Sequence, residues 1–256
     1  MAFVPDYRTY APGAAADGAS IDAGLRSYML RVYNWMTSGL VLTGIVSYGI
    51  ANTSLIELFY QRVQTPRGYS VQPTILGYAA IFAPLVFTMV LSFGVNKLSK
   101  TAVQALFWAF AATMGASIAN IFLIYSGASI ARVFFITAAT FGAMSLYGYT
   151  TKSDLSRMGS FLIMGLIGIV VASLVNMFIG STALQFAISV IGVLIFVGLT
   201  AYDTQRIKGD FVQYAYAEGT AGAAVRSVYD ALSLYLNFIN LFMLLLQLFG
   251  NRSSNN

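Results

Sequence analysis

The chain has 256 residues, of which 58% are hydrophobic and only 9% are charged, and its formal net charge is +5. A soluble domain carries roughly 25% charged residues because its surface faces water, so most of this chain's surface must face an apolar medium. The absence of cysteine and histidine excludes disulfides, thiolate chemistry, histidine-ligated metals and Ser-His or Cys-His catalysis. The 14 basic residues are spread along the chain, so we expect a lipid bilayer as partner and no nucleic acid.

Seven apolar segments are long enough to cross a membrane, since a spanning helix needs about 20 mostly apolar residues. They cover residues 32–51, 74–94, 102–125, 130–149, 159–179, 182–201 and 231–250. We therefore predict an all-α membrane protein with seven transmembrane helices in one domain, residues 26–250. A flexible cytoplasmic tail, residues 1–25, would precede this domain, and a short C-terminal tail, residues 251–256, would follow it.

The connections between these segments differ in length. Only Gly180 and Ser181 separate the fifth and sixth segments, which predicts a tight antiparallel hairpin. Two loops are long, residues 52–73 and residues 204–229. The third segment places small residues four positions apart, which lets membrane helices approach closely. These are Ala111, Gly115 and Ala119.

The distribution of Lys and Arg predicts the orientation. With the N-terminus inside, ten basic residues lie on the cytoplasmic side and four on the other. The inside set is Arg8, Arg26, Arg31, Lys97, Lys100, Lys152, Arg157, Arg206, Lys208 and Arg226, and the outside set is Arg62, Arg67, Arg132 and Arg252. Cytoplasmic loops carry the excess of positive charge, so we predict N-in and C-out.

Two acidic residues lie at the cytoplasmic ends of spanning segments, Asp203 closing the sixth and Asp230 opening the seventh. Asp230 could simply favour the positive end of its helix, whereas Asp203 lies at a helix C-terminal end, where the dipole disfavours an anion. A cation or a shared proton should therefore stabilise Asp203. Candidate partners on the same side are Lys97, Lys100 and Arg206.

The seventh segment also contains Asn237 and Asn240. Asp230 and Asn237 are seven residues apart and so share a helix face, about 10 Å apart along the axis. This pattern favours a polar path that enters from the cytoplasm, and Asn120 and Asn176 could line the same path. The alternative is interhelical hydrogen bonding, which membrane helices commonly use for packing.

Three stretches carry a resemblance to a known family. They are MSLYGYTTKSDLS (residues 144–156), FVGLTAYDTQ (residues 196–205) and ALSLYLNFINLF (residues 231–242). In type, order and spacing they resemble the Bax inhibitor-1 family, in its bacterial YccA/YetJ-like branch. The resemblance covers nearly the whole chain after the N-terminal tail and implies a multi-pass protein of the bacterial inner membrane.

The resemblance also implies a fold in which six helices surround the last one, and a pH-sensitive calcium leak governed by two cytoplasmic-side aspartates. One of these corresponds to Asp203. At the position of the other this chain has Asn237, so a pair of carboxylates sharing one proton is replaced by a carboxylate and an amide. Any pH response would then rest on Asp203 itself, or on Asp230 taking the missing role.

Two functions remain open at this point. The first is a cation leak channel, with Ca²⁺ as the permeant ion, a gate formed by Asp203, Asp230, Asn237 and Asn240, and transient metal contacts at Asp203 and Asp230. The second is a non-conducting regulator that binds a membrane quality-control protease, as the resemblance suggests, or other membrane proteins. We expect no enzymatic activity and no cofactor, because the histidine of a Ser-His protease and a lysine in the last helix for retinal are both missing.

Overall fold

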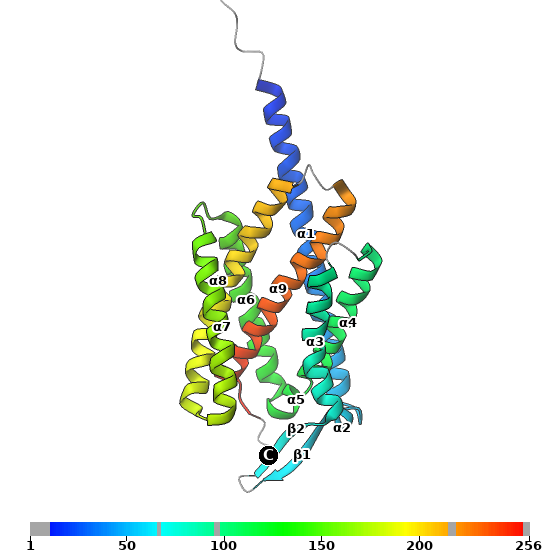
Figure 1. Ribbon diagram of the computed structural model, residues 1–256, viewed down its shortest axis with the longest axis vertical. Helices are drawn as coiled ribbons and strands as arrows, with labels where there is room; N and C mark the ends of the chain where they lie inside the picture. The colour runs from blue at the N-terminus through cyan, green and yellow to red at the C-terminus, as the bar shows by residue number, and fades with distance from the viewer. Residues whose placement is uncertain (1–10, 66–67, 95–97, 215–218, 253–256) are drawn as a thin grey trace, which may run out of the picture.

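The computed structural model describes residues 11–65, 68–94, 98–214 and 219–252. Over this part of the chain, helices run almost end to end and one short β-hairpin interrupts them (Figure 1). The elements are α1 (Ala11–Ala51), α2 (Ile56–Phe59), β1 (Tyr60–Thr65), β2 (Gly68–Pro73), α3 (Ile75–Gly94), α4 (Lys100–Ile118), α5 (Ile121–Ile124), α6 (Gly127–Thr150), α7 (Ser156–Ile179), α8 (Thr182–Tyr214) and α9 (Gly219–Phe249).

Six helical stretches are long and apolar enough to cross a membrane. They are Ile75–Gly94, Lys100–Ile124, Gly127–Thr150, Ser156–Ile179, Thr182–Gln213 and Gly222–Phe249. The first predicted segment, residues 32–51, is helical within α1 but is not among these six. The fold is therefore a mainly α-helical, membrane-type bundle, and the antiparallel hairpin of β1 and β2 is an addition to the predicted all-α class.

The C-terminal helix α9 lies at the centre of the bundle. Its main neighbours are α1, α4, α6 and α8, while α3 packs chiefly on α4 and α7 chiefly on α8. Leu234, Tyr235, Leu241 and Leu246 of α9 are fully buried. The predicted ring of six helices is thus an inner layer of four around α9, with α3 and α7 outside it.

Small residues set the closest helix contacts, because they let two backbones approach. The predicted small-residue face packs α4 against α1: a Cβ added to Gly115 would lie 2.7 Å from the carbonyl oxygen of Thr43. The Thr43 hydroxyl donates to the carbonyl of Ala111 at 2.8 Å across the same interface. Ala111 and Ala119 are fully buried.

The hairpin predicted at Gly180 and Ser181 is present. Helix α7 ends at Ile179 and α8 begins at Thr182, and Gly180 has a left-handed backbone with φ of 68°. Glycine adopts this conformation without a steric penalty, which explains the residue type at the turn. The two helices pack along their lengths, so α7 is held in the bundle mainly through α8.

Several helix ends differ from the predicted boundaries. Helix α8 continues to Tyr214 and α9 begins at Gly219, so most of the predicted loop 204–229 is helical. The added turns of α8 are held by packing: Ile207 is fully buried, and the Phe211 ring lies 4.8 Å from that of Tyr28 on α1. Hydropathy predicts where a helix leaves the membrane. Helices α8 and α9 continue beyond that point, so the boundaries predicted from hydropathy are too short.

Helix α1 begins at Ala11, inside the predicted tail of residues 1–25. The predicted third span is broken after Ile118, where α4 stops and the short α5 follows. Here the Tyr60 hydroxyl donates to the Ser117 carbonyl at 2.5 Å, which satisfies an acceptor near the helix end. Burial raises the pKa of Tyr60 to about 12, so its hydroxyl remains a donor at physiological pH.

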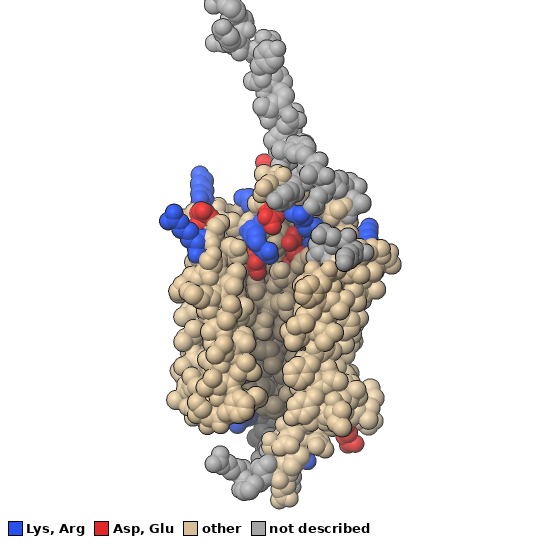
Figure 2. Space-filling view, in the orientation of Figure 1, with Lys and Arg blue, Asp and Glu red and all other residues tan. Residues whose placement is uncertain are grey.

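Charged side chains gather at one end of the bundle, above a broad uncharged band (Figure 2). We call this end the charged end: α6 finishes there, α7 starts there, and the polar turns of α8 and α9 extend from it. Its basic residues include Lys152, Arg157, Arg206, Lys208 and Arg226. The opposite end carries the β-hairpin and the turn between α7 and α8 (Figure 1).

The contact of α6 with α8 gives a stability prediction. A Cβ on Gly148 would lie 2.2 Å from the carbonyl oxygen of Ala201, so the two backbones would have to separate. We expect Gly148→Ala to lower the free energy of unfolding in detergent by about 3 kcal/mol, the upper end of the usual cost of overpacking. Gly168→Ala on α7 is the control, since a Cβ there meets nothing within 4 Å. Equal stability of the two variants would contradict the close contact.

Candidate functional site

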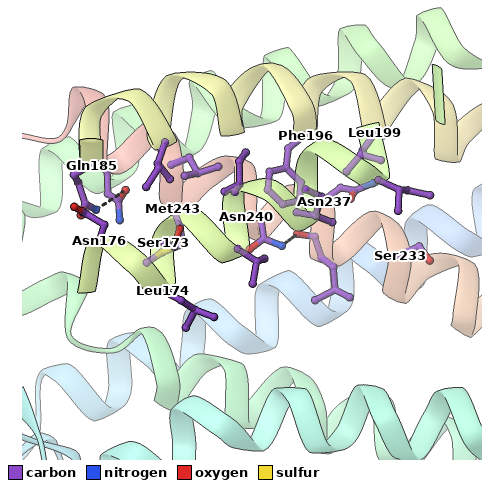
Figure 3. A pocket seen from close by; sticks show the side chains of 18 of the residues that line it. Ser173, Leu174, Asn176, Gln185, Phe196, Leu199, Ser233, Asn237, Asn240 and Met243 are labelled. Carbon is purple, nitrogen blue, oxygen red and sulfur yellow. Dashed lines mark hydrogen bonds between the residues drawn. The ribbon is translucent and has the colours of Figure 1, made fainter. Parts of the chain in front are cut away.

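A groove lies between α7, α8 and α9 and has a volume of about 960 Å³ (Figure 3). Asp203 and Asn237 line one part of it, near the charged end, and Asn176, Gln185 and Gln247 line another, near the opposite end. Aliphatic and aromatic side chains make up most of the wall between them. The polar members of the lining are Ser173, Asn176, Gln185, Tyr202, Asp203, Ser233, Asn237, Asn240 and Gln247.

The carboxylate of Asp203 is held from two sides. Its Oδ1 accepts from Arg206 Nη2 at 3.0 Å within α8, and its Oδ2 accepts from Asn237 Nδ2 of α9 at 2.7 Å. The side chain of Asp203 is 14% exposed and that of Arg206 is 37% exposed. A largely buried carboxylate needs both a countercharge and hydrogen bonds to offset its lost hydration, and this pair of contacts supplies them.

Arg206 has unused hydrogen-bonding capacity beside this pair. Its Nε is buried and has no hydrogen-bond partner among the described residues, although its Nη2 binds Asp203. A buried donor without an acceptor costs about 1–3 kcal/mol. The ion pair with Asp203 therefore holds the guanidinium in a position where its Nε makes no hydrogen bond to a described residue.

The residues around Asp203 in the sequence fasten α8 to its neighbours. The ring of Tyr202 packs against Gly159 of α7, where a Cβ would come within 2.3 Å of it. The Thr204 hydroxyl donates to the Thr200 carbonyl at 2.8 Å and lies 2.9 Å from the Ser145 hydroxyl of α6. Asp203 is therefore positioned by contacts to α6, α7 and α9 together.

Gln205 holds the connection between α6 and α7. Its Oε1 accepts from the backbone amide of Leu155 at 2.8 Å, and its Nε2 donates to the carbonyl of Ser153 at 2.8 Å. Asp154 in the same loop accepts from the Ser156 amide at 2.9 Å, and this bond holds the pKa of its carboxyl below the usual range. Asp154 is therefore an ionised, exposed carboxylate outside the groove.

Single polar side chains lie along the middle of the groove. Asn240 of α9 donates to the carbonyl of Leu236 one turn earlier, at 2.9 Å, and Ser173 of α7 also lines the groove (Figure 3). The side chain of Asn240 is exposed on the bundle surface. Polar groups at this depth are costly in lipid, so a groove that admits water would favour them.

Amide side chains join all three helices near the opposite end. Asn176 Nδ2 donates to Gln185 Oε1 at 3.2 Å, and Gln185 Nε2 donates to Gln247 Oε1 at 3.4 Å. Gln247 Oε1 also accepts from the Ser189 hydroxyl at 2.9 Å. The groove therefore has a charged contact at one end and a neutral amide cluster at the other.

Asp230 lies on α9 but is not among the residues that line the groove. Its Oδ2 accepts from the Tyr28 hydroxyl of α1 at 2.5 Å, and the side chain is 8% exposed. Its charged neighbours are Arg206, Asp210 and Arg226. Asp203 and Asp230 thus have different hydrogen-bonding partners on different helices, although the sequence placed them as joint metal contacts.

The other predicted residues fall as follows. Lys100 is exposed at the start of α4 and forms no ion pair in the described part of the chain. Lys97 lies outside the described residues. Asn176 lines the groove, whereas Asn120 lies at the break between α4 and α5 and does not. Of the three proposed cations, Arg206 is the one paired with Asp203.

Three features escaped the sequence reasoning. Gln185 was missed, although it and Asn176 flank the turn at Gly180 at similar distances, so an antiparallel hairpin brings them together. Tyr28 was missed because it lies four residues before the first predicted span. The double contact of Gln205 could be suspected only from its place directly after Asp203 and Thr204.

The fold and the groove define a multi-pass helical membrane protein with a carboxylate held in a polar, largely buried site. Residues 25–254 match the family model described as inhibitor of apoptosis-promoting Bax1, and the chain belongs to this Bax inhibitor-1 family. The resemblance predicted from the three sequence stretches is therefore confirmed.

Similar proteins are found across bacteria. The inner membrane protein YbhL of Escherichia coli is 47% identical over 231 residues, which cover 90% of this chain and 94% of YbhL. A Caulobacter vibrioides protein is 46% identical over 245 residues, covering 95% and 96% of the two chains, and a Rickettsia prowazekii protein is 45% identical over 233 residues, covering 91% and 93%. With its apolar helices, the chain is accordingly a multi-pass protein of the bacterial inner membrane.

The contacts of Gln205 give a testable prediction. In Gln205→Leu the buried amide of Leu155 loses its acceptor, so we expect a loss of about 1–3 kcal/mol in the free energy of unfolding. The freed loop should also be cut faster by trypsin after Lys152 in detergent. Gln213→Leu on the same helix is the control, because Gln213 is exposed. Unchanged cleavage in Gln205→Leu would contradict the role of Gln205 in holding the connection between α6 and α7.

Proposed function

We propose that this protein is a non-enzymatic cation leak pathway, with Ca²⁺ as the permeant ion, that runs along the groove between α7, α8 and α9. The observation that carries the proposal is the carboxylate of Asp203, held between Arg206 and Asn237 in the wall of a polar-lined groove. Asp203 is the one acidic side chain among the described residues that line this groove, and its contact with α9 ties two walls of the groove together. Asp203 and Asn237 therefore form the gate.

Protonation of Asp203 opens this gate. The cross-helix bond is charge-assisted while Asp203 is ionised, and such bonds are roughly twice as strong as neutral ones. A protonated Asp203 loses that advantage and also releases Arg206, whose Nε already lacks an acceptor in the described structure. Acid therefore loosens the contact between α8 and α9, and the leak rises as the pH falls.

A single carboxylate cannot complete the coordination of Ca²⁺, which takes six to eight oxygen ligands. The amide oxygens of Asn237 and Asn240 and the hydroxyl of Ser233 line the groove near Asp203 and can contribute further oxygens. Water supplies the rest. Such a partial ligand set suits a passing ion, because a conducted ion must leave as readily as it binds. Asp230 takes no direct part, since it does not line the groove and instead accepts from Tyr28 of α1.

The proposed topology has seven spanning helices, with the charged end in the cytoplasm. Helix α1 supplies the seventh span: its N-terminal part projects at the charged end, whereas α9 finishes at the opposite end (Figure 1). A path from the start of α1 to the end of α9 therefore needs an odd number of crossings, and the six apolar stretches alone give an even one. The excess of Lys and Arg at the charged end supports N-in and C-out.

The projection of α1 beyond the bundle favours a second candidate, a regulator that binds other membrane proteins such as a quality-control protease (Figure 1). A helix of 41 residues extends past the thickness of a bilayer and offers a surface away from the lipid. The two roles differ in one measurable property, which is ion flux through the purified protein.

Calcium flux into dye-loaded proteoliposomes tests the proposal over about pH 5 to 8, the range in which most proteins are stable. We expect the native leak to rise as the pH falls, by up to about tenfold per pH unit for a single titrating group. Asp203→Asn should leave a leak that no longer depends on pH. Asn237→Asp should move the pH at which the leak rises, because two facing carboxylates share a proton.

Asp154→Asn is the matched control, since it removes an exposed carboxylate at the same end of the bundle but outside the groove. Its leak should match that of the native protein. If folded native protein gives no flux above empty liposomes at any pH, the proposed leak pathway is wrong. The protein is then better described as a regulator that binds other membrane proteins. A pH response that survives Asp203→Asn would place the gate elsewhere.

A further inference from the structure

A second hollow, of about 800 Å³, lies along α1, beside Trp108 of α4. Its lining combines charged, polar and aromatic side chains. The members are Ala23, Arg26, Ser27, Leu30, Arg31, Asn34, Trp35, Ser38 and Trp108. All but Trp108 come from a single face of α1, where they recur at intervals of three and four residues.

The chemistry of this hollow changes along α1. Arg26, Ser27 and Arg31 lie toward the charged end, and Trp35 follows Arg31 by one helical turn, about 6 Å along the axis. The Trp35 and Trp108 rings are 5.6 Å apart and together form an aromatic wall. Trp35 also makes an edge contact with Phe107 of the core, which fixes its orientation. The hollow is therefore cationic at its outer part and aromatic at its inner part.

The two arginines form no salt bridge with the side chains that the structure describes. Both are exposed, and within the described residues the ion pair of Arg206 with Asp203 is the one salt bridge. Asp22 lies one turn before Arg26 on α1 but does not pair with it. Two unpaired guanidinium groups at the edge of the apolar band favour an anionic ligand, and guanidinium groups bind phosphate in a bidentate manner.

We infer that this hollow binds an anionic glycerophospholipid of the surrounding bilayer, with its phosphate against Arg26 and Arg31 and its glycerol and first acyl carbons against Trp35 and Trp108. The aromatic wall selects a lipid over a free phosphate ion, because an ion leaves that wall unused. Tryptophan at the membrane interface and basic pockets between helices are both suited to lipid headgroups. The inference is independent of ion conduction.

The tryptophans provide the test, since the chain has two and both line this hollow. Bromine on an acyl chain quenches tryptophan emission on contact. In nanodiscs of equal bromolipid content, we expect brominated phosphatidylglycerol to occupy the site in preference to brominated phosphatidylcholine, on the order of tenfold at low ionic strength. High salt should reduce this preference, because the arginines are exposed to the solvent.

Arg26→Gln with Arg31→Gln should remove the preference, whereas Arg157→Gln, which deletes an exposed arginine of α7 at the same end, should keep it. Arg26→Lys with Arg31→Lys keeps the charge and should retain most of the preference, so a folding defect of the glutamine variant is recognised. Equal quenching by the two lipids in native protein overturns the inference, and so does a preference that salt does not change. Inorganic phosphate at matched ionic strength should not displace the lipid; displacement would assign the site to the free anion.

Discussion

Polar groups inside an apolar bundle have no water to bind, and the rest of this structure depends on how they are satisfied. Lipid offers no hydrogen bonds, so each hydroxyl, amide and carboxylate at membrane depth needs a partner within the protein. The residues around Asp203 meet this requirement by joining α8 to α6, α7 and α9. Helix association in a bilayer gains little from the hydrophobic effect, so these bonds and the glycine contacts hold the bundle together.

Different kinds of contact join the helices at the two ends of the groove. Near the charged end a carboxylate carries the cross-helix contact, and its strength depends on a proton. Near the opposite end Asn176, Gln185 and Gln247 are neutral amides, which do not titrate. Under the proposed gating, protonation of Asp203 would act on one end of the groove and leave the amide contacts at the other end unchanged, so the three helices would remain joined.

Much of the architecture was predictable from the sequence, because a spanning segment has a length and a hydropathy that few other structures share. The turn at Gly180 and the small-residue face at Gly115 were also found correctly, since each depends on local residue type. The ends of α8 and α9 were not, because tertiary packing of Ile207 and Phe211 extends the helix beyond its apolar part. The salt bridge of Asp203 with Arg206 was among the alternatives that the sequence offered, but the hydrogen bond of Asp203 to Asn237 could be found only from the structure.

Helical periodicity put Asp230 on the same face of α9 as Asn237. Periodicity does not say which helix lies opposite each residue, and Tyr28 of α1 lies opposite Asp230.

The polar turns of α8 and α9 extend well beyond the proposed gate. Helix α8 continues for 11 residues after Asp203, and α9 has 11 residues before Asp230, so each arm is about 16 Å long. A tilt of about 10° at the gate would move the tip of such an arm by roughly 3 Å. The same geometry works in the other direction: a ligand or protein bound to these turns outside the membrane would apply torque to the contact between α8 and α9, several turns away from where it binds.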